Sequence, residues 1–142
     1  MSTEIEGLNE IGKALNKIAD TAKARQLLTK ACLIVETAAR ENASKFKGNG
    51  DLGRSIESKV VEGTTGLEGV VFSPLEYAPY VEYGTGIFAE EKGREDVPWS
   101  YQDEQGEWHT TSGMKPQPFL RPALTDNKQA ILRMIKKEIA KQ

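Results

Sequence analysis

Apolar residues recur every three or four positions over the first third of the chain, which is the period of a helix with one buried face. They are Ile5, Leu8, Ile11, Leu15, Ile18 and Ala22, followed by Leu27, Leu28, Ala31, Ile34, Val35 and Ala38. Gly48, Asn49 and Gly50 come next, and glycine and asparagine readily adopt the left-handed conformation that ends helices. We therefore predict an N-terminal helical region over residues 4–47.

The hydrophobic pattern then changes to that of strands. Ser55–Glu62 and Leu67–Phe72 are rich in valine, isoleucine and phenylalanine, and they flank Gly63-Thr64-Thr65-Gly66. Two such runs around a glycine-containing turn predict a β-hairpin, here over residues 53–73. Pro74 ends the second strand, because proline cannot donate a hydrogen bond to a strand ladder.

A second hairpin is predicted beyond a charged, glycine-containing segment, residues 87–96, which we interpret as a flexible loop. Two short runs, Val97–Gln102 and Glu107–Thr111, flank the turn-forming residues Asp103-Glu104-Gln105-Gly106. This order predicts a hairpin over residues 97–111.

The chain ends in a second predicted helix, residues 121–141. Its apolar stripe consists of Leu124, Ile131, Leu132, Ile135 and Ile139, with lysines over much of the rest. Pro122 suits the first turn, where a helix needs no backbone N–H donor. Helices at both ends of antiparallel strands indicate one α+β domain over residues 1–142, with an N-terminal helical region, a small antiparallel sheet built from two hairpins, and a C-terminal amphipathic helix.

Charge is distributed unevenly along the chain, although the formal net charge is only −2. Residues 82–107 contain two basic residues against eight acidic ones, net −6, whereas residues 108–142 contain seven basic residues against two acidic ones, net +5. Two interpretations stay open: ordinary solvated surface with lysines that complement the dipole of the last helix, or complementary faces that meet between subunits. The small net charge argues against nucleic acid wrapped over the whole surface.

Neither a membrane segment nor a disulfide is indicated. No apolar run reaches membrane-spanning length, and the acidic N-terminus lacks the features of a secretory signal, so no membrane partner is expected. Cys32 is the one cysteine, which excludes an intrachain disulfide and fits a reducing compartment. Its place in an apolar helical stretch predicts a buried side chain rather than a nucleophile.

The candidate catalytic and ligand-binding motifs are weak. Gly84-Thr85-Gly86 lacks the lysine of a phosphate-binding loop. His109 has no second histidine or cysteine nearby and no accompanying nucleophile motif, so it is a poor metal ligand and a poor catalytic base. Four clustered carboxylates in the charged loop favour solvation or a weak cation site over acid–base chemistry. They are Glu90, Glu91, Glu95 and Asp96. We expect no enzyme, no cofactor and no metal site.

Tyr77-Ala78-Pro79-Tyr80-Val81-Glu82-Tyr83-Gly84-Thr85 is the most informative segment. Three tyrosines in seven residues supply amphipathic area of the kind enriched at interfaces, or they fill a corner at one end of the sheet. The segment resembles a motif of the head–tail joining proteins of siphophages, the HK-ninety-seven gene-product-ten-like family. Gly50-Asp51-Leu52-Gly53-Arg54-Ser55-Ile56 and Pro116–Leu124 are similar to further blocks of that family, in the same order.

The resemblance implies an α+β fold, self-assembly into a ring, and a place at the head–tail junction as a neck, tail-completion or minor tail component. It also implies that the protein is not catalytic, that DNA passes through the ring lumen, and that the partners are neighbouring connector and tail proteins. The expected location is the virion, after assembly in the host cytoplasm.

These segments contain the residues for which we expect structural or interface roles. Structural or interface roles are expected for Arg54, Tyr77, Tyr80, Glu82, Tyr83, Gly84, Phe119 and Arg121. Glu82 is expected to pair with Arg54 or Arg121, within or between subunits. We further predict that the four loop carboxylates face the lumen, where they would repel DNA and let it slide.

Two functions from other classes stay open. A small DNA-binding accessory protein would use the basic last helix, with an affinity for duplex DNA that falls steeply with salt. A hydrolase would need a concave pocket that contains a carboxylate with a strongly shifted pKa. The aromatic residues lie within the acidic stretch, and this disfavours base stacking.

Overall fold

Helix α2, Thr21–Ser44, is the element on which much of the described chain packs. The structure, a computed structural model, describes residues 21–45, 50–63, 66–86, 90, 99–102 and 105–141. The buried residues of α2 recur at helical spacing: Ala24, Leu27, Leu28, Ala31, Cys32, Val35, Ala39 and Ala43. α2 lies within the stretch predicted to be helical, while residues 4–20 and the predicted stop at 48–49 lie outside the described residues.

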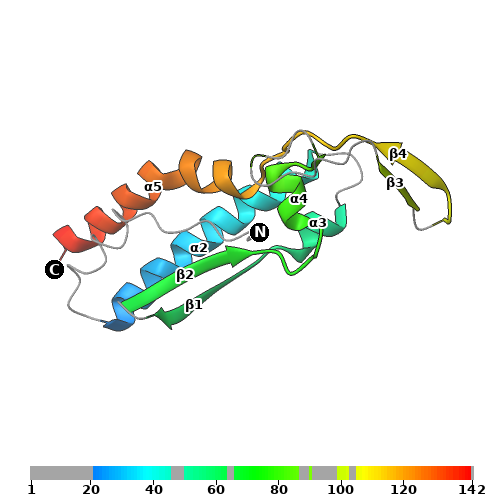
Figure 1. The fold of residues 1–142 in the computed structure, drawn as a ribbon. Helices are drawn as coiled ribbons and strands as arrows, with labels where there is room; N and C mark the ends of the chain where they lie inside the picture. The colour runs from blue at the N-terminus through cyan, green and yellow to red at the C-terminus, as the bar shows by residue number, and fades with distance from the viewer. Residues whose placement is uncertain are drawn as a thin grey trace.

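Helix α5, Leu120–Ala140, runs alongside α2 (Figure 1). Its buried face consists of Leu120, Ala123, Ile131, Leu132 and Ile135. Near the C-terminal end of α5, Glu138 forms an ion pair with Lys23 of α2, with 3.0 Å between Nζ of Lys23 and Oε2 of Glu138. The two helices therefore share one apolar seam, as the amphipathic pattern of the last helix predicts.

The first hairpin covers α2 with strands β1, Glu57–Gly63, and β2, Gly66–Phe72. The strands are antiparallel, and Val60 lies opposite Gly69. A Cβ atom added at Gly69 would lie 2.5 Å from Sγ of Cys32, so glycine allows the strand to approach the helix. Cys32 is buried, as expected, and this burial, helped by the charge of Glu36, raises the pKa of its thiol to about 11.

A short helix replaces the predicted start of this hairpin. The first strand was predicted to begin at Ser55, within a hairpin over residues 53–73, but Gly50–Ser55 forms helix α3 and β1 begins at Glu57. Leu52 and Ile56 are fully buried, and the hydroxyl of Ser55 donates to the carbonyl of Leu52. Burial of these two side chains in the core beside α2 outweighs the strand propensity of the segment.

The second hairpin consists of β3, Trp99–Gln102, and β4, Trp108–Thr111. In the described chain it forms its own two-stranded sheet, whereas one small sheet from both hairpins was expected. α3 and helix α4, Ala78–Tyr83, lie between the two hairpins, and β3–β4 projects away from the body (Figure 1). The predicted α+β class, with helices before and after antiparallel hairpins, is confirmed. Apart from Glu90, the predicted loop 87–96 lies outside the described residues.

We predict that Gly69→Ala lowers the free energy of unfolding by about 1–3 kcal/mol, because the added methyl overpacks against Cys32. Urea denaturation measures the loss. Cys32→Ala in the same chain makes room, so the double variant should lose less than the sum of the two single variants. Glu68→Ala, on the exposed neighbouring residue, should change stability by no more than about 0.5 kcal/mol. Equal losses for Gly69→Ala and Glu68→Ala would contradict the contact.

Candidate functional site: the α4–α5 junction

The segment from Tyr77 to Thr85 contains a short helix that the hydrophobic pattern did not predict. α4 spans Ala78–Tyr83, with Pro79 in its first turn. Proline is pre-organised for that position, where its missing N–H is not needed. Gly84 ends the helix at φ 83° and donates its N–H to the carbonyl of Tyr80 at 2.8 Å. Six residues are too few to show helical periodicity in the sequence, so this helix could not be predicted from the pattern.

The two sides of α4 differ in chemistry. Ala78, Val81 and Glu82 are buried, at the three- and four-residue spacing that places them on one face. Tyr77 and Tyr80 lie on the other side and are 40% and 51% exposed. Neither of these two side chains is buried in a corner of the sheet. A helix with a carboxylate on its buried face requires a partner for that charge.

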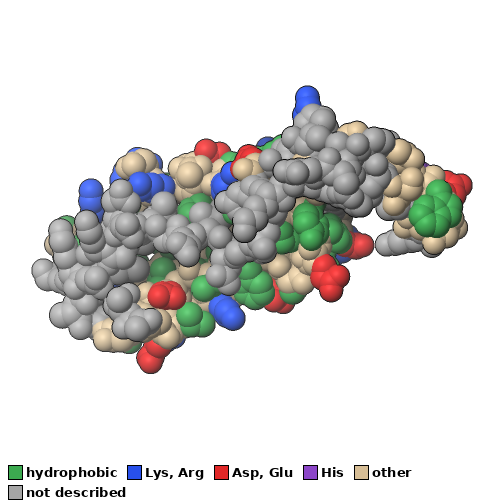
Figure 2. Space-filling model, in the orientation of Figure 1, with side chains coloured by type: hydrophobic (Ala, Val, Ile, Leu, Met, Phe, Trp, Pro, Cys, Tyr) green, Lys and Arg blue, Asp and Glu red, His purple; other side chains and the backbone are tan. Residues whose placement is uncertain are grey.

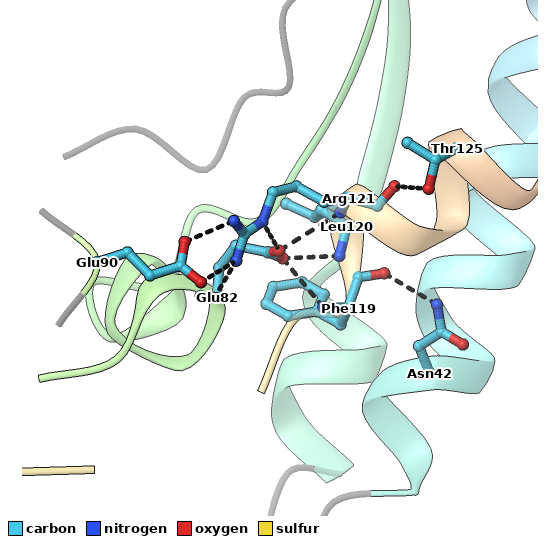
Figure 3. A network of polar contacts seen from close by, with 7 residues as sticks. All are labelled: Asn42, Glu82, Glu90, Phe119, Leu120, Arg121 and Thr125. Atoms are coloured by element: carbon cyan, nitrogen blue, oxygen red, sulfur yellow. Dashed lines mark hydrogen bonds and ion pairs between the residues drawn. The ribbon is translucent and has the colours of Figure 1, made fainter. Parts of the chain in front are cut away.

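Glu82 finds this partner at the N-terminus of α5 (Figure 3). Its Oε1 accepts the backbone N–H groups of Phe119 at 3.0 Å and Leu120 at 2.7 Å. Its Oε2 accepts the N–H of Arg121 at 3.4 Å. The first N–H groups of a helix have no partner within it and carry partial positive charge. Glu82 therefore caps α5 from another helix.

The residue at the usual capping position explains this arrangement. Phe119 precedes the first turn of α5 and has no side chain that can accept a hydrogen bond. Its ring is fully buried instead, so the position serves the core. The capping carboxylate comes from Glu82, 37 residues earlier in the chain.

Arg121 completes the charge balance of the junction. Its Nε donates to Oε2 of Glu82 at 2.7 Å, and its Nη2 donates to the Glu82 carbonyl at 2.8 Å. Its Nη1 donates to Glu90 at 2.6 Å, and the guanidinium carbon lies 4.7 Å from the centroid of the Tyr83 ring. The hydrogen bonds of Glu90 and Glu82 raise the pKa of Arg121 above its ordinary value. The cation is thus held by two carboxylates and an aromatic face.

Of the two pairings open for Glu82, the structure shows the one with Arg121, within one chain. Arg54 pairs instead with Asp51 on the same short helix, and its side chain is 75% exposed. Tyr83 and Gly84 lie in the junction, and so do Phe119 and Arg121. Arg54 does not.

Two further contacts bind the junction to its surroundings. Nδ2 of Asn42, on α2, donates to the Phe119 carbonyl at 3.1 Å. The N–H of Gln117 donates to the Val81 carbonyl at 2.7 Å. Sequence reasoning missed Asn42, whose only signal was a polar side chain near the end of an apolar helix. Three helices thus meet at the N-terminus of α5.

Of the four carboxylates predicted to face the lumen, the structure describes one, Glu90. Glu90 is engaged with Arg121, and its N–H donates to the Tyr83 carbonyl at 2.9 Å. Glu91, Glu95 and Asp96 lie outside the described residues. Within the part of the chain that the structure describes, no three potential ligand side chains gather in a way that suits a metal ion. No described helix is both long enough and apolar enough to cross a bilayer.

We predict that Glu82→Ala lowers the free energy of unfolding by about 1–3 kcal/mol, because the buried amides of Phe119 and Leu120 lose their acceptor while Arg121 keeps its pair with Glu90. Glu82→Gln retains an accepting oxygen and should lose less. Chemical denaturation compares these variants with Arg54→Ala, whose exposed ion pair should contribute less than about 1 kcal/mol. A larger loss for Arg54→Ala than for Glu82→Ala would overturn the assignment.

Comparison with known proteins finds a family that matches the chain up to the end of α4. The family described as "Bacteriophage HK97-gp10, putative tail-component" matches residues 8–84, more than half of the chain. The match takes in α4 with Glu82 and stops before α5 with Arg121. No curated protein and no solved structure matches the chain. The chain belongs to the HK97-gp10-like family of phage tail components, and its role is that of a bacteriophage structural protein.

Proposed function

We propose that this protein is a non-enzymatic component of the head–tail junction, where it forms or joins a ring through which DNA passes. Its partners are other copies of itself and the neighbouring connector and tail proteins. It acts in the virion and reaches it during assembly in the host cytoplasm. Membership of a phage tail-component family supports the structural part of this proposal.

The observation that carries the junction proposal is the exposed aromatic side of α4. Tyr77 and Tyr80 project from a helix whose opposite side is fixed to α5 by the Glu82 cap. Tyrosine combines a large apolar area with a polar end, so it is favoured at interfaces that also contact water. A surface that is already rigid loses little entropy on binding. This side of α4 is therefore suited to a permanent contact in an assembly.

The acidic segment supports a lumen position. Residues 82–107 keep a formal net charge of −6, from two basic residues against eight acidic ones. Arg121, which lies outside this segment, offsets part of the charge of Glu82 and Glu90. In our proposal the remaining carboxylates of the loop, Glu91, Glu95 and Asp96, face the channel with Glu90 and repel the DNA backbone, so that DNA slides without being held.

Electron microscopy of phage particles that lack this protein tests the proposal. We expect filled heads and complete tails that are not joined, because the junction component is missing. Expression of the wild-type protein from a plasmid should restore joined virions. Normal joined virions in the absence of the protein would contradict the proposal.

The same complementation assay tests the surface of α4. Tyr80→Ser should lower the infectious titre by about tenfold or more, because exposed tyrosines often dominate interface energies. The matched control is Leu33→Ser, since Leu33 is also about half exposed but lies on α2. Thermal denaturation should show both variants folded. Full titre with Tyr80→Ser would show that this side of α4 is not the interface.

A further inference from the structure

The β3–β4 hairpin is a projecting arm with an exposed tryptophan. We define the arm as Trp99–Thr111, and it extends away from the helical body (Figure 1). Trp108 is 69% exposed, the highest value among the exposed large hydrophobic side chains of the described chain. A two-stranded hairpin alone is marginally stable in water. An exposed tryptophan on such a hairpin therefore points to a binding partner.

The base of the arm is fixed to the body. The N–H of Thr85 donates to the Met114 carbonyl at 2.9 Å, and the N–H of Met114 donates to Oγ1 of Thr85 at 2.8 Å. Gly86 and Gly113, both at positive φ, cross so closely that a Cβ on either would overlap the other segment. Thr85 directly follows Gly84, the end of α4. The junction that holds α4 therefore also sets the direction of the arm.

The arm is acidic, and the far end of the molecule is basic. Between Trp99 and Thr111 the sequence contains Asp103, Glu104 and Glu107 and no lysine or arginine. Figure 2 shows an acidic side chain beside a hydrophobic one at the outer end of the arm, and basic side chains over α5. The exposed basic residues in the second half of α5 are Arg133, Lys136 and Lys137, and Lys141, directly after the helix, pairs with Glu138 at 3.3 Å. The two charged regions lie at opposite ends of the chain, as the positions of β4 and the C-terminus show (Figure 1).

We propose that the arm of one copy docks on the basic surface of α5 of the next copy. Opposite charges attract the arm to α5. The indole of Trp108 can also stack on a lysine or arginine side chain, because tryptophan is the aromatic residue that attracts cations most strongly. Within one chain the two surfaces are too far apart to meet. A contact between different surfaces on identical subunits is head-to-tail, and it closes into a ring when the rotation between subunits permits.

A second copy fits the arm better than DNA does. The three acidic residues of the arm would be repelled by phosphates, whereas the α5 surface of another copy supplies the complementary charge. This inference rests on the proposed ring and adds the surfaces that build it. It also predicts that a ring contact involves residues beyond 84, outside the part of the chain that matches the family.

Cysteine cross-linking in assembled particles tests the contact. Thr110→Cys, two positions from Trp108 on β4, and Ala140→Cys, beside Lys136 and Lys137 on α5, are both exposed and keep Trp108 and the lysines. The two variants are expressed together in the absence of the wild-type protein, and the joined virions are treated with a short bismaleimide. We expect a cross-linked product of two chains, because the arm of one copy lies against the second half of α5 of the next. Cys32 is buried, and the pKa of its thiol is raised to about 11, so the wild-type protein should give no such product.

The controls separate this contact from other arrangements. Either variant expressed alone should give no product, and Thr29→Cys, on the exposed side of α2, should not cross-link to Thr110→Cys. A single chain that carries both Thr110→Cys and Ala140→Cys should give a ladder that ends at the closed ring. If Thr110→Cys links to itself, to another phage protein or to nothing in joined virions, the arm contact is wrong. The proposed function would be contradicted only by joined virions that lack the protein altogether.

Discussion

The carboxylate of Glu82 is the constraint on which the arrangement of α4 and α5 depends. It is fully buried and accepts hydrogen bonds from the N-terminal amides of α5 and from Arg121. A buried charge is costly unless its partners are complete, and here the dipole of α5 and the guanidinium together supply them. Such a group contributes more to selecting one arrangement of α4 and α5 than to overall stability. The apolar seam of α2 and α5 stabilises the body, and the cap fixes how α4 lies on it.

Two surfaces depend on this placement. The outward side of α4 presents Tyr77 and Tyr80, and the chain leaving α4 runs through Thr85 to the base of the arm. A change at Glu82 should therefore disturb both surfaces, although neither contains it. In the proposed ring, rigid docking surfaces at fixed angles would allow identical subunits to repeat the same contact. The proposed contact between the acidic arm and the basic half of α5, at opposite ends of the chain, would give that repeat a direction.

Local patterns were enough to predict the long elements. The three- and four-residue spacing from Leu27 to Ala38 predicted the helix that is now α2, and glycine between β-branched runs predicted the first hairpin. The α4–α5 junction was harder to predict from the sequence, because Glu82 and Arg121 lie 39 residues apart and no local pattern links them. Both were named as candidates, with Arg54 as an alternative partner, but the capping role depends on a tertiary contact with the amides of Phe119 and Leu120. The short helices α3 and α4 were missed since burial of Leu52 and Val81, rather than periodicity, determines them.

Amide hydrogen exchange measured by NMR tests the Glu82 cap most directly. Amides in the first turn of a helix normally exchange fast because they lack an intrahelical partner. The cap predicts that the amides of Phe119 and Leu120 exchange slowly in the wild-type protein, as slowly as the amide of Ile135, a buried residue in the second half of α5. In Glu82→Gln, where the charge is lost, these two amides should exchange faster while that of Ile135 is little changed. Fast exchange of Phe119 and Leu120 in the wild-type protein would contradict the account.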